Sequence, residues 1–438
     1  MAVTSRAVLV ALAGLLPVAV LPAPVTVLVW AVVVAVLCAV DVALAASPRE
    51  VAVSRDVPRA VRLGQATRSA LTLRAVGDRR VRALVRDAWP PSALPGGDAP
   101  TGARTPRHRV DVPPGESRTV TTPLVPTRRG DLPGDRVTLR TVGPLGLAGR
   151  QVSLTVPARL RVLPEFASRR HLPSRLARLR ELDGRAAVQV RGAGTEFDSL
   201  REYVDGDDVR SIDWRATARR QEVVVRTWRP ERDRHVLLVV DTSRTSAARV
   251  LDATRLEASV EAALLLGVLA AHAGDRVELL AYDRRVRARV ADTHQSRVLP
   301  GLAEALAGVQ PELVETDWAG LVTQVRSRLS RRALVVLLTS LDPAAVEQGL
   351  LEVVGQLTRR HQVVLASVAD PELEELRTAR RTVEEVFDAA AAERALLERA
   401  AVGVRLRQRG VEVVEALPDD LAPRLADTYL ALKAAGRL

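Results

Sequence analysis

An aspartate with hydroxyl side chains at two-residue steps directly follows one of the apolar runs of this chain. The run covers residues 236–240, and Asp241, Ser243 and Thr245 come after it. Carboxylate and hydroxyl oxygens are hard ligands, which suit Mg²⁺. Two interpretations are open: these side chains are metal ligands, or Asp241 caps the following turn through its side-chain oxygen without any ion.

Other side chains that could carry out catalysis lack the partners that a reaction needs. The carboxylates of Glu196 and Asp198 could do acid and base work, but neither a nucleophile nor a glycine-rich cradle accompanies them. The chain contains no Gly-x-Ser-x-Gly motif, no phosphate-binding Walker loop and no His-Glu-x-x-His zinc helix. We therefore predict no catalytic residue and a protein that is not an enzyme, with a hydrolase as an alternative.

The elements that must position Asp241 are indicated by the alternation of apolar runs and helical stretches after residue 234. Strands are predicted at 236–240, 277–282, 333–338, 363–368 and 411–416, with helices at 251–273, 297–307, 319–329, 343–360 and 384–402. This order predicts an α/β fold with a doubly wound parallel sheet. Because ligands bind beyond the carboxyl ends of the strands in such sheets, Asp241 is expected at the binding edge.

The pattern at Asp241 resembles the metal-ion-dependent adhesion site of von Willebrand factor A domains, Asp-x-Ser-x-Ser. The resemblance implies a threonine on a second loop, and Thr316 occupies the corresponding place here. It also implies an aspartate after the fourth strand, where this chain has Ser340, with the nearest carboxylate, Asp342, two residues further on. With a single carboxylate, we expect a low affinity for Mg²⁺ until a carboxylate from a partner completes the shell.

A dense run of acidic, arginine and aromatic residues occupies positions 194–219. Paired carboxylate and guanidinium groups hold a loop in one geometry, so this segment is expected to be ordered. Two interpretations remain open. Either its charged residues form an internal network that docks the segment onto the next domain, or the segment recognises a partner or ligand. The residues of the expected network are Arg201, Glu202, Asp207, Arg210 and Asp213.

The same run resembles the signature of the bacterial family known as domain of unknown function 58. The signature residues, which are also our candidates for partner binding, are Glu196, Phe197, Arg201, Glu202, Tyr203, Gly206, Asp207, Arg210, Asp213, Trp214 and Arg219. The resemblance extends to the order of the domains along the chain. It implies a protein that acts beside a MoxR-type AAA+ ATPase as an adaptor or chaperone-like partner.

The first 47 residues predict a transmembrane hairpin of two helices. No charged residue occurs between positions 7 and 40, and Pro22 and Pro24 interrupt the run near its middle. The two halves approach the length of about 20 residues that crosses a hydrocarbon core. A cleaved signal peptide is the alternative, but the apolar stretch is about twice as long as the usual hydrophobic region of a signal peptide.

The charges around the hairpin predict its orientation. Arg6 precedes it and several arginines follow it, so the positive-inside rule places both ends in the cytoplasm. Asp41 is expected to lie at the membrane interface. The only cysteine, Cys38, cannot form a disulfide within the chain, which agrees with a cytosolic location. We therefore expect a multi-pass protein of the cell membrane whose soluble domains face the cytoplasm.

Three further regions are predicted after the hairpin. Residues 48–165 contain about seven short strands separated by Pro and Gly, a pattern typical of a β-sandwich that serves as a spacer or interaction module. Residues 166–234 hold a helical linker and the signature segment. Residues 235–438 form the von Willebrand factor A-like domain.

The net charge of +12 would ordinarily favour a polyanionic partner. Here the arginines are scattered among 52 acidic residues, with no basic stripe rich in aromatics, so no nucleic-acid binding is expected. The sequence therefore predicts a membrane-anchored adaptor or scaffold that acts with a MoxR-type ATPase through an A-type domain, with Mg²⁺ as a candidate cofactor. A structural protein that organises the envelope without an ATPase is the alternative.

Overall fold

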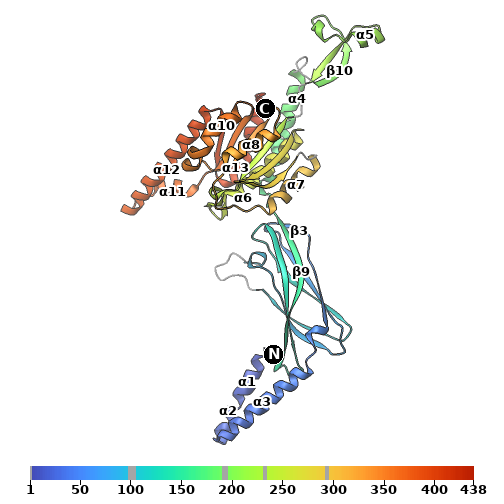
Figure 1. Ribbon diagram of the computed structural model, residues 1–438, viewed down its shortest axis with the longest axis vertical. Coiled ribbons are helices and arrows are strands. Elements are labelled where there is room, and N and C mark those ends of the chain that lie inside the picture. Colours follow the sequence, from blue (N-terminus) through green and yellow to red (C-terminus); the bar gives the residue numbers. More distant parts are fainter. Residues whose placement is uncertain (1, 97–104, 190–195, 230–233, 292–294) are drawn as a thin grey trace. The chain divides into compact units, whose positions relative to one another are not determined.

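The computed structural model describes residues 2–96, 105–189, 196–229, 234–291 and 295–438, and it does not describe the side chains within 183–199 and 227–233 (Figure 1). The chain divides into two compact units, Met1–Glu165 and Phe166–Leu438. The first holds the apolar N-terminal helices and a β-rich region. The second is a mixed α/β region.

The first unit begins with apolar helices whose large side chains are mostly exposed. Its first elements are β1 (Ala2–Val3), α1 (Ser5–Ala13), α2 (Leu15–Val20) and α3 (Pro24–Leu44). Pro24 stands at the start of α3, where a missing N–H costs nothing. Among the described residues, α3 is the one helix that is long and apolar enough to cross a membrane. The segment Ser5–Val20 is shorter, so of the two predicted spans only α3 meets the length criterion.

Asp41, in the last turn of α3, is fully buried and fastens this helix to the β-rich region. Its carboxylate accepts hydrogen bonds from the backbone N–H groups of Leu145 at 2.8 Å, Leu147 at 2.7 Å and Ala148 at 2.9 Å. These residues lie at the turn between strands β8 (Gly130–Val142) and β9 (Ala148–Leu163). The sequence placed Asp41 at the membrane interface but did not indicate that its carboxylate would be buried against the β-rich region.

The β-rich region consists of two sheets that share an apolar core. One has the order β1-β9-β8-β5-β6 with β3 beside β9, and the other has the order β2-β4-β7. The remaining strands are β2 (Val51–Asp56), β3 (Ala60–Arg62), β4 (Thr67–Ala75), β5 (Val81–Asp87), β6 (Arg107–Val112) and β7 (Ser117–Leu124). Alternate residues of both sheets point inward, among them Leu71 of β4 and Leu139 of β8.

The second unit contains a six-stranded sheet with the order β16-β15-β12-β17-β18-β19. Its strands are β12 (His235–Asp241), β15 (Arg276–Tyr282), β16 (Val286–Val290), β17 (Leu334–Leu338), β18 (Gln362–Val368) and β19 (Val411–Ala416). All neighbouring pairs are parallel except β15 and β16. The five strands expected from sequence are therefore present, whereas the antiparallel edge strand β16 was not predicted.

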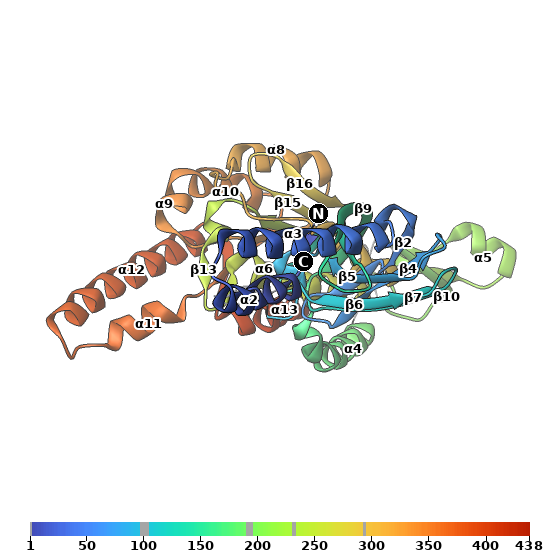
Figure 2. The same cartoon turned by 90° about the horizontal axis from the view of Figure 1, so that it is seen from below.

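Helices cover both faces of this sheet (Figures 1 and 2). The helices on one face are α6 (Arg255–His272), α7 (Gln295–Ala307) and α13 (Pro418–Ala434), and those on the other are α8 (Trp318–Arg328), α10 (Leu351–Thr358) and α12 (Val383–Gln408). Successive residues of β12 enter opposite cores: Leu238 packs with the first set and Leu237 with the second. The helix expected at 343–360 is divided into α9 (Pro343–Ala345), a π-helical turn (Val346–Leu350) and α10.

The signature segment forms a small structure of its own, which we call the arm. Strands β10 (Glu196–Glu202) and β11 (Val224–Arg229) pair antiparallel, and a 3₁₀ turn (Val209–Ser211) and α5 (Trp214–Arg220) lie between them in sequence. Helix α4 (Leu172–Gln189) precedes the arm.

Candidate functional site

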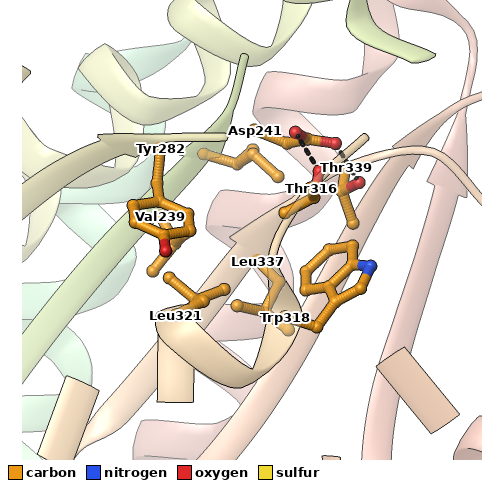
Figure 3. A pocket seen from close by; sticks show the side chains of 9 residues that line it. Val239, Asp241, Tyr282, Thr316, Trp318, Leu321, Leu337 and Thr339 are labelled. Atoms are coloured by element: carbon orange, nitrogen blue, oxygen red, sulfur yellow. Dashed lines mark hydrogen bonds between the residues drawn. The ribbon is translucent and has the colours of Figure 1, made fainter. Parts of the chain in front are cut away.

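The candidate site lies where β12 ends, at the carboxyl edge of the parallel sheet. Asp241 is the last residue of β12 and is 4% exposed. The loop after it carries Ser243 and Thr245, Thr316 lies just before the N-cap of α8, and Thr339 follows β17. Because β17 is the parallel neighbour of β12, both strands deliver their ends to the same place (Figure 3).

Four hydroxyl groups and one backbone N–H surround the Asp241 carboxylate. Its Oδ1 accepts from the Thr316 hydroxyl and from the Ser243 N–H, both at 2.9 Å. Its Oδ2 accepts from the hydroxyls of Ser243 at 3.1 Å, Thr245 at 3.2 Å and Thr339 at 2.6 Å. All four residues proposed from sequence as metal ligands are therefore brought together, and Figure 3 shows the bonds from Thr316 and Thr339.

Thr339 belongs to this cluster but was missed by sequence reasoning, which considered its neighbour Ser340. The Ser340 hydroxyl points elsewhere: it accepts from Arg255 Nη1 at 3.2 Å and from the N–H of Asp342 at 3.1 Å. A usable signal was present, because the expected strand ended at residue 338 and the next residue already carried a hydroxyl. The resemblance directed attention one residue too far.

Three other aspartates close to this loop in sequence or space have structural roles. Asp342 accepts from the N–H groups at the start of α9, and Asp317 accepts from the N–H of Gly320 at the start of α8. Asp283 is fully buried, and it accepts from Arg287 at 2.5 Å and from the Thr242 hydroxyl at 3.0 Å. Of these four aspartates, Asp241 is the one whose carboxylate faces the hydroxyl cluster of the candidate site.

The electrostatics of Asp283 follow from these contacts. Burial alone would raise the pKa of its carboxyl, but hydrogen bonds from Arg287, from the N–H groups of Arg284 and Arg285 and from Thr242 together hold that pKa below its usual value. Asp283 is therefore charged and satisfied. Through Thr242 it supports the loop that carries the hydroxyls of the candidate site.

The oxygen set around Asp241 fits a hard divalent cation in type and only partly in charge. A Ser or Thr hydroxyl that donates its hydrogen to a carboxylate keeps lone pairs for a metal ion. Within the described part of the chain, however, no group of three or more His, Cys, Asp or Glu side chains could hold a metal. One carboxylate and four neutral hydroxyls leave half of a divalent charge uncompensated.

The space beneath Asp241 is too small for an organic substrate. A cavity of about 10 Å³ is lined by Val239, Asp241, Tyr282, Thr316, Trp318, Leu321, Leu337, Leu338 and Thr339 (Figure 3). That volume is close to the minimum for one water molecule. The arrangement is suited to hold an ion or a water molecule at the sheet edge, and it offers no room there for a buried small molecule.

The charged residues of the arm bind one another. Arg201 makes a bidentate pair with Asp207 at 2.5 and 2.7 Å, and this hydrogen bonding lowers the pKa of the Asp207 carboxyl. Asp213 caps α5 by accepting from the first N–H groups of that helix and also binds Arg226 at 2.8 Å. Three of the five residues expected in a network are therefore paired, and Arg226 is a partner that sequence reasoning missed.

The remaining signature residues are mostly exposed. Trp214 is 69% exposed, although tryptophan carries a large apolar surface, and Val204 and Val209 of the same segment are each 62% exposed. The side chains of Glu202, Arg210 and Arg219 are exposed, Tyr203 is half-buried, and Gly206 has a φ of 106° in the turn before Asp207. Glu196 and Phe197 belong to β10 and pair through their backbones with β11, and their side chains lie outside the described set.

The match to a known protein family lies within this second unit. The sequence model of the family described as "Protein of unknown function DUF58" matches residues 199–412. The uncharacterized proteins Rv1480 of Mycobacterium tuberculosis and Mb1516 of Mycobacterium bovis are each 30% identical over 190 residues, which cover 42% of this chain and 57% of the relative. The chain thus spans less than two thirds of these relatives.

Two solved structures match short stretches of this chain. A CARDB domain from Pyrococcus furiosus is 15% identical, covers 28% of this chain and 92% of its own, and has a TM-score of 0.19. A PapD-like domain of human CEP192 is 13% identical, covers 27% of this chain and 89% of its own, and has a TM-score of 0.18. Scores this low support no inference about fold or function.

Proposed function

We propose that this protein is a membrane-anchored adaptor that binds partner proteins through a von Willebrand factor A-like second unit and does not catalyse a reaction. The observation that carries the proposal is the cluster at Asp241. One buried carboxylate and the hydroxyls of Ser243, Thr245, Thr316 and Thr339 meet at the carboxyl edge of a parallel sheet. That edge is where open α/β sheets bind their ligands.

Mg²⁺ is the cofactor that this cluster would take. Asp241, Ser243, Thr245 and Thr316 would hold the ion, and Thr339 adds a fifth oxygen that was not among the ligands predicted from sequence. When bound, the ion would supply a site for an acidic side chain of a partner, because the cluster itself contributes one negative charge. In the alternative without metal, Asp241 organises the loop as the acceptor of five hydrogen bonds.

Two observations favour a binding role over catalysis. Asp283, Asp317 and Asp342 are each occupied by structural hydrogen bonds, and Glu315, which adjoins Thr316, is paired with Arg244. No free second carboxylate among these four is therefore left beside Asp241 for acid and base work. The cavity below Asp241 holds about 10 Å³, far below the several hundred Å³ of a typical small-molecule site.

The arm supplies a second candidate surface. Its ion pairs are satisfied within the arm, whereas Trp214, Val204 and Val209 are exposed. Tryptophan is among the residues that contribute most to protein interfaces, since it buries a large rigid area. We therefore assign partner recognition to these apolar side chains, and to the charged signature residues the task of holding the arm in shape.

A MoxR-type AAA+ ATPase is the partner we propose, following the resemblance of the signature segment. We place α3 in the membrane, and α1 and α2 with it, because Trp30 of α3 donates a 3.2 Å hydrogen bond to the carbonyl of Val10 in α1. Arg6 before these helices and the arginines after them favour cytoplasmic ends for both. The adaptor would then meet an ATPase at the cytoplasmic membrane surface.

Calorimetric titration of Mg²⁺ into the full chain in detergent tests the metal. We expect heat with the wild type and none with Asp241→Ala, while the matched variant Asp252→Ala, which alters an exposed aspartate of the same region, behaves as wild type. Equal heats for all three proteins would discard the metal site.

Affinity purification from membranes tests the partner. The tagged wild type should recover a MoxR-type ATPase in the presence of Mg²⁺, and Trp214→Ala should recover at least tenfold less. If the folded wild type recovers none, the adaptor role is wrong and a structural role in the envelope without an ATPase takes its place.

A further inference from the structure

Helix α12 carries two rows of small and apolar side chains on opposite sides. The inner row is buried against the protein and consists of Ala389, Ala392, Arg399, Val402, Gly403 and Leu406. The outer row faces solvent and consists of Val383, Phe387, Ala390, Arg394, Leu397, Ala401 and Val404. The outer positions 387, 390, 397, 401 and 404 each precede an inner position by two residues, which turns the two rows about 200° apart on a helix of 3.6 residues per turn. We call the outer row the exposed seam.

The exposed seam is unusual for a helix at the surface of a soluble region. Val383 is 76% exposed, Phe387 72%, Leu397 62% and Val404 49%. A surface helix normally has a single apolar stripe that faces its own core, and α12 already has one in its inner row. Figures 1 and 2 show α11 (Pro371–Thr378) and α12 extending together away from the sheet. An apolar row along such an extension indicates contact with another molecule.

The spacing of the exposed seam specifies the kind of contact. Its members follow one another at steps of four, three, four, three, four and three residues, which is the heptad repeat of a coiled coil. Six of the seven positions are apolar or alanine. The exception is Arg394, which pairs with Glu398 at 2.8 Å on the surface of the same helix. The 26 residues of α12 span about 39 Å, enough for three heptads.

We propose that the exposed seam binds the exposed seam of a second copy of this chain, with the two α12 helices antiparallel. Charge favours this occupant. The residues that flank the seam are acidic in its first part, with Glu384 and Glu393, and basic at its end, with Arg405 and Arg407. When two copies lie antiparallel so that Phe387 faces Val404 of the second copy, Glu384 of each lies opposite Arg405 of the other.

The same charges disfavour other occupants. In a parallel pair, Glu393 of one copy would lie beside Glu398 of the other, and the two Arg394 side chains would share one layer. In the antiparallel pair, Arg394 instead faces Leu397 of the second copy. An anionic lipid surface that contacted Val383 and Phe387 would also meet Glu384, Glu385 and Asp388. It would repel these negative charges.

Cross-linking in native membranes tests both contact and direction. Glu384→Cys and Arg405→Cys are made separately in a Cys38→Ala background with different tags, and a short bis-maleimide is added to cells that express one or both. The two positions are 21 residues apart, about 31 Å along one helix. We expect a cross-linked dimer only when both variants are present. Self-cross-linking of either single variant would show a parallel pair, and no cross-link in any combination would show that another molecule covers the seam; both outcomes overturn the proposal.

Substitution of the seam provides an independent readout. Leu397→Ser and Phe387→Ser should each lower the yield of the mixed cross-link at least tenfold. Asp388→Ser, at an exposed position of the same helix outside the seam, and Leu313→Ser, which removes an 83% exposed leucine elsewhere in the unit, should leave the yield unchanged. Equal yields for all four variants would also overturn the proposal.

Discussion

The Thr339 hydroxyl donates a 2.6 Å hydrogen bond to Oδ2 of Asp241, and this contact joins the ends of two neighbouring parallel strands. Both residues are more than nine-tenths buried. The bond therefore has a structural role beyond satisfying one oxygen of the Asp241 carboxylate. It fixes the position of the β17 end relative to the Asp241 loop, and with it the spacing of the hydroxyls that could bind an ion or a partner.

Thr339→Val should test this role, because valine keeps the shape of threonine and removes the hydroxyl. A buried hydrogen bond to a charged group contributes about 1.5–3 kcal/mol, so we expect a loss of about 2 kcal/mol in the free energy of unfolding. Thr339→Ser keeps the hydroxyl and should cost less. Denaturant unfolding of the two variants and the wild type measures the difference. A valine variant as stable as the serine variant would show that the bond contributes little.

Asp41→Ala should loosen the attachment of α3 to the β-rich region. The substitution leaves three backbone N–H groups without their acceptor, and we expect a loss of about 3 kcal/mol in the stability of the first unit. The stability of Asp41→Asn should lie between those of the wild type and Asp41→Ala, because an amide retains one oxygen acceptor. Scanning calorimetry of the full chain in detergent gives the melting temperatures. Identical values for the three proteins would contradict the role assigned to Asp41.

The sequence predicted the parts of this fold that depend on local pattern. The five apolar strands of the second unit follow from runs of Val and Leu, and the place of Asp241, Ser243 and Thr245 follows from where the first run ends. Thr316 was indicated only by the resemblance to the metal site of A-type domains. What it missed depends on partners far away in the chain. Strand β16 has polar residues and gains its place by pairing with β15.

Two individual residues show why the rest was not predictable from pattern. Asp41 is buried because the turn after β8 supplies three N–H groups, about 105 residues later in the chain, and no local pattern indicates that. Thr339, not Ser340, faces Asp241 because the direction of a side chain alternates along a strand end, where an error of one residue reverses the face.

Arg287→Ala should destabilise the protein at neutral pH and less so in acid. Asp283 is charged and fully buried, and removing the guanidinium that pairs with it should cost about 2–3 kcal/mol. Because its pKa in the folded state lies below the value in the unfolded chain, near 3.8, its contribution to stability is present above about pH 4 and is lost as the pH falls through the folded-state pKa.

The difference in stability between wild type and Arg287→Ala should therefore shrink below about pH 4, where a protonated carboxyl no longer needs the arginine. Arg285→Ala serves as the matched control, because its side chain is exposed and only its backbone N–H contacts Asp283. Urea unfolding at a series of pH values measures both variants. A difference that stays constant with pH would assign the effect to packing and not to the charge of Asp283.

His361 should make stability depend on pH in a separate window. It is buried beside a cleft of about 380 Å³ lined by Arg332, Arg359, Arg360 and Arg409, and burial, followed by the charge of Arg360, lowers the pKa of its ring below the usual 6.5. The unfolded chain therefore binds a proton at this ring more tightly than the folded protein does. The contribution of neutral His361 to the free energy of unfolding is complete above pH 6.5 and is lost as the pH falls from there toward the folded-state pKa, by at most about 1.4 kcal/mol per pH unit.

Replacing His361 by leucine should remove this slope between about pH 6.5 and 5.5, whatever its effect on stability at pH 8. His272→Gln alters an exposed histidine of α6 and should keep the slope of the wild type. Unfolding free energies at closely spaced pH values decide the matter, because the carboxylate effects at Asp283 begin only below about pH 4. If the leucine variant keeps the wild-type slope of unfolding free energy against pH, His361 does not cause it. The folded protein would then tolerate the charged form of this ring.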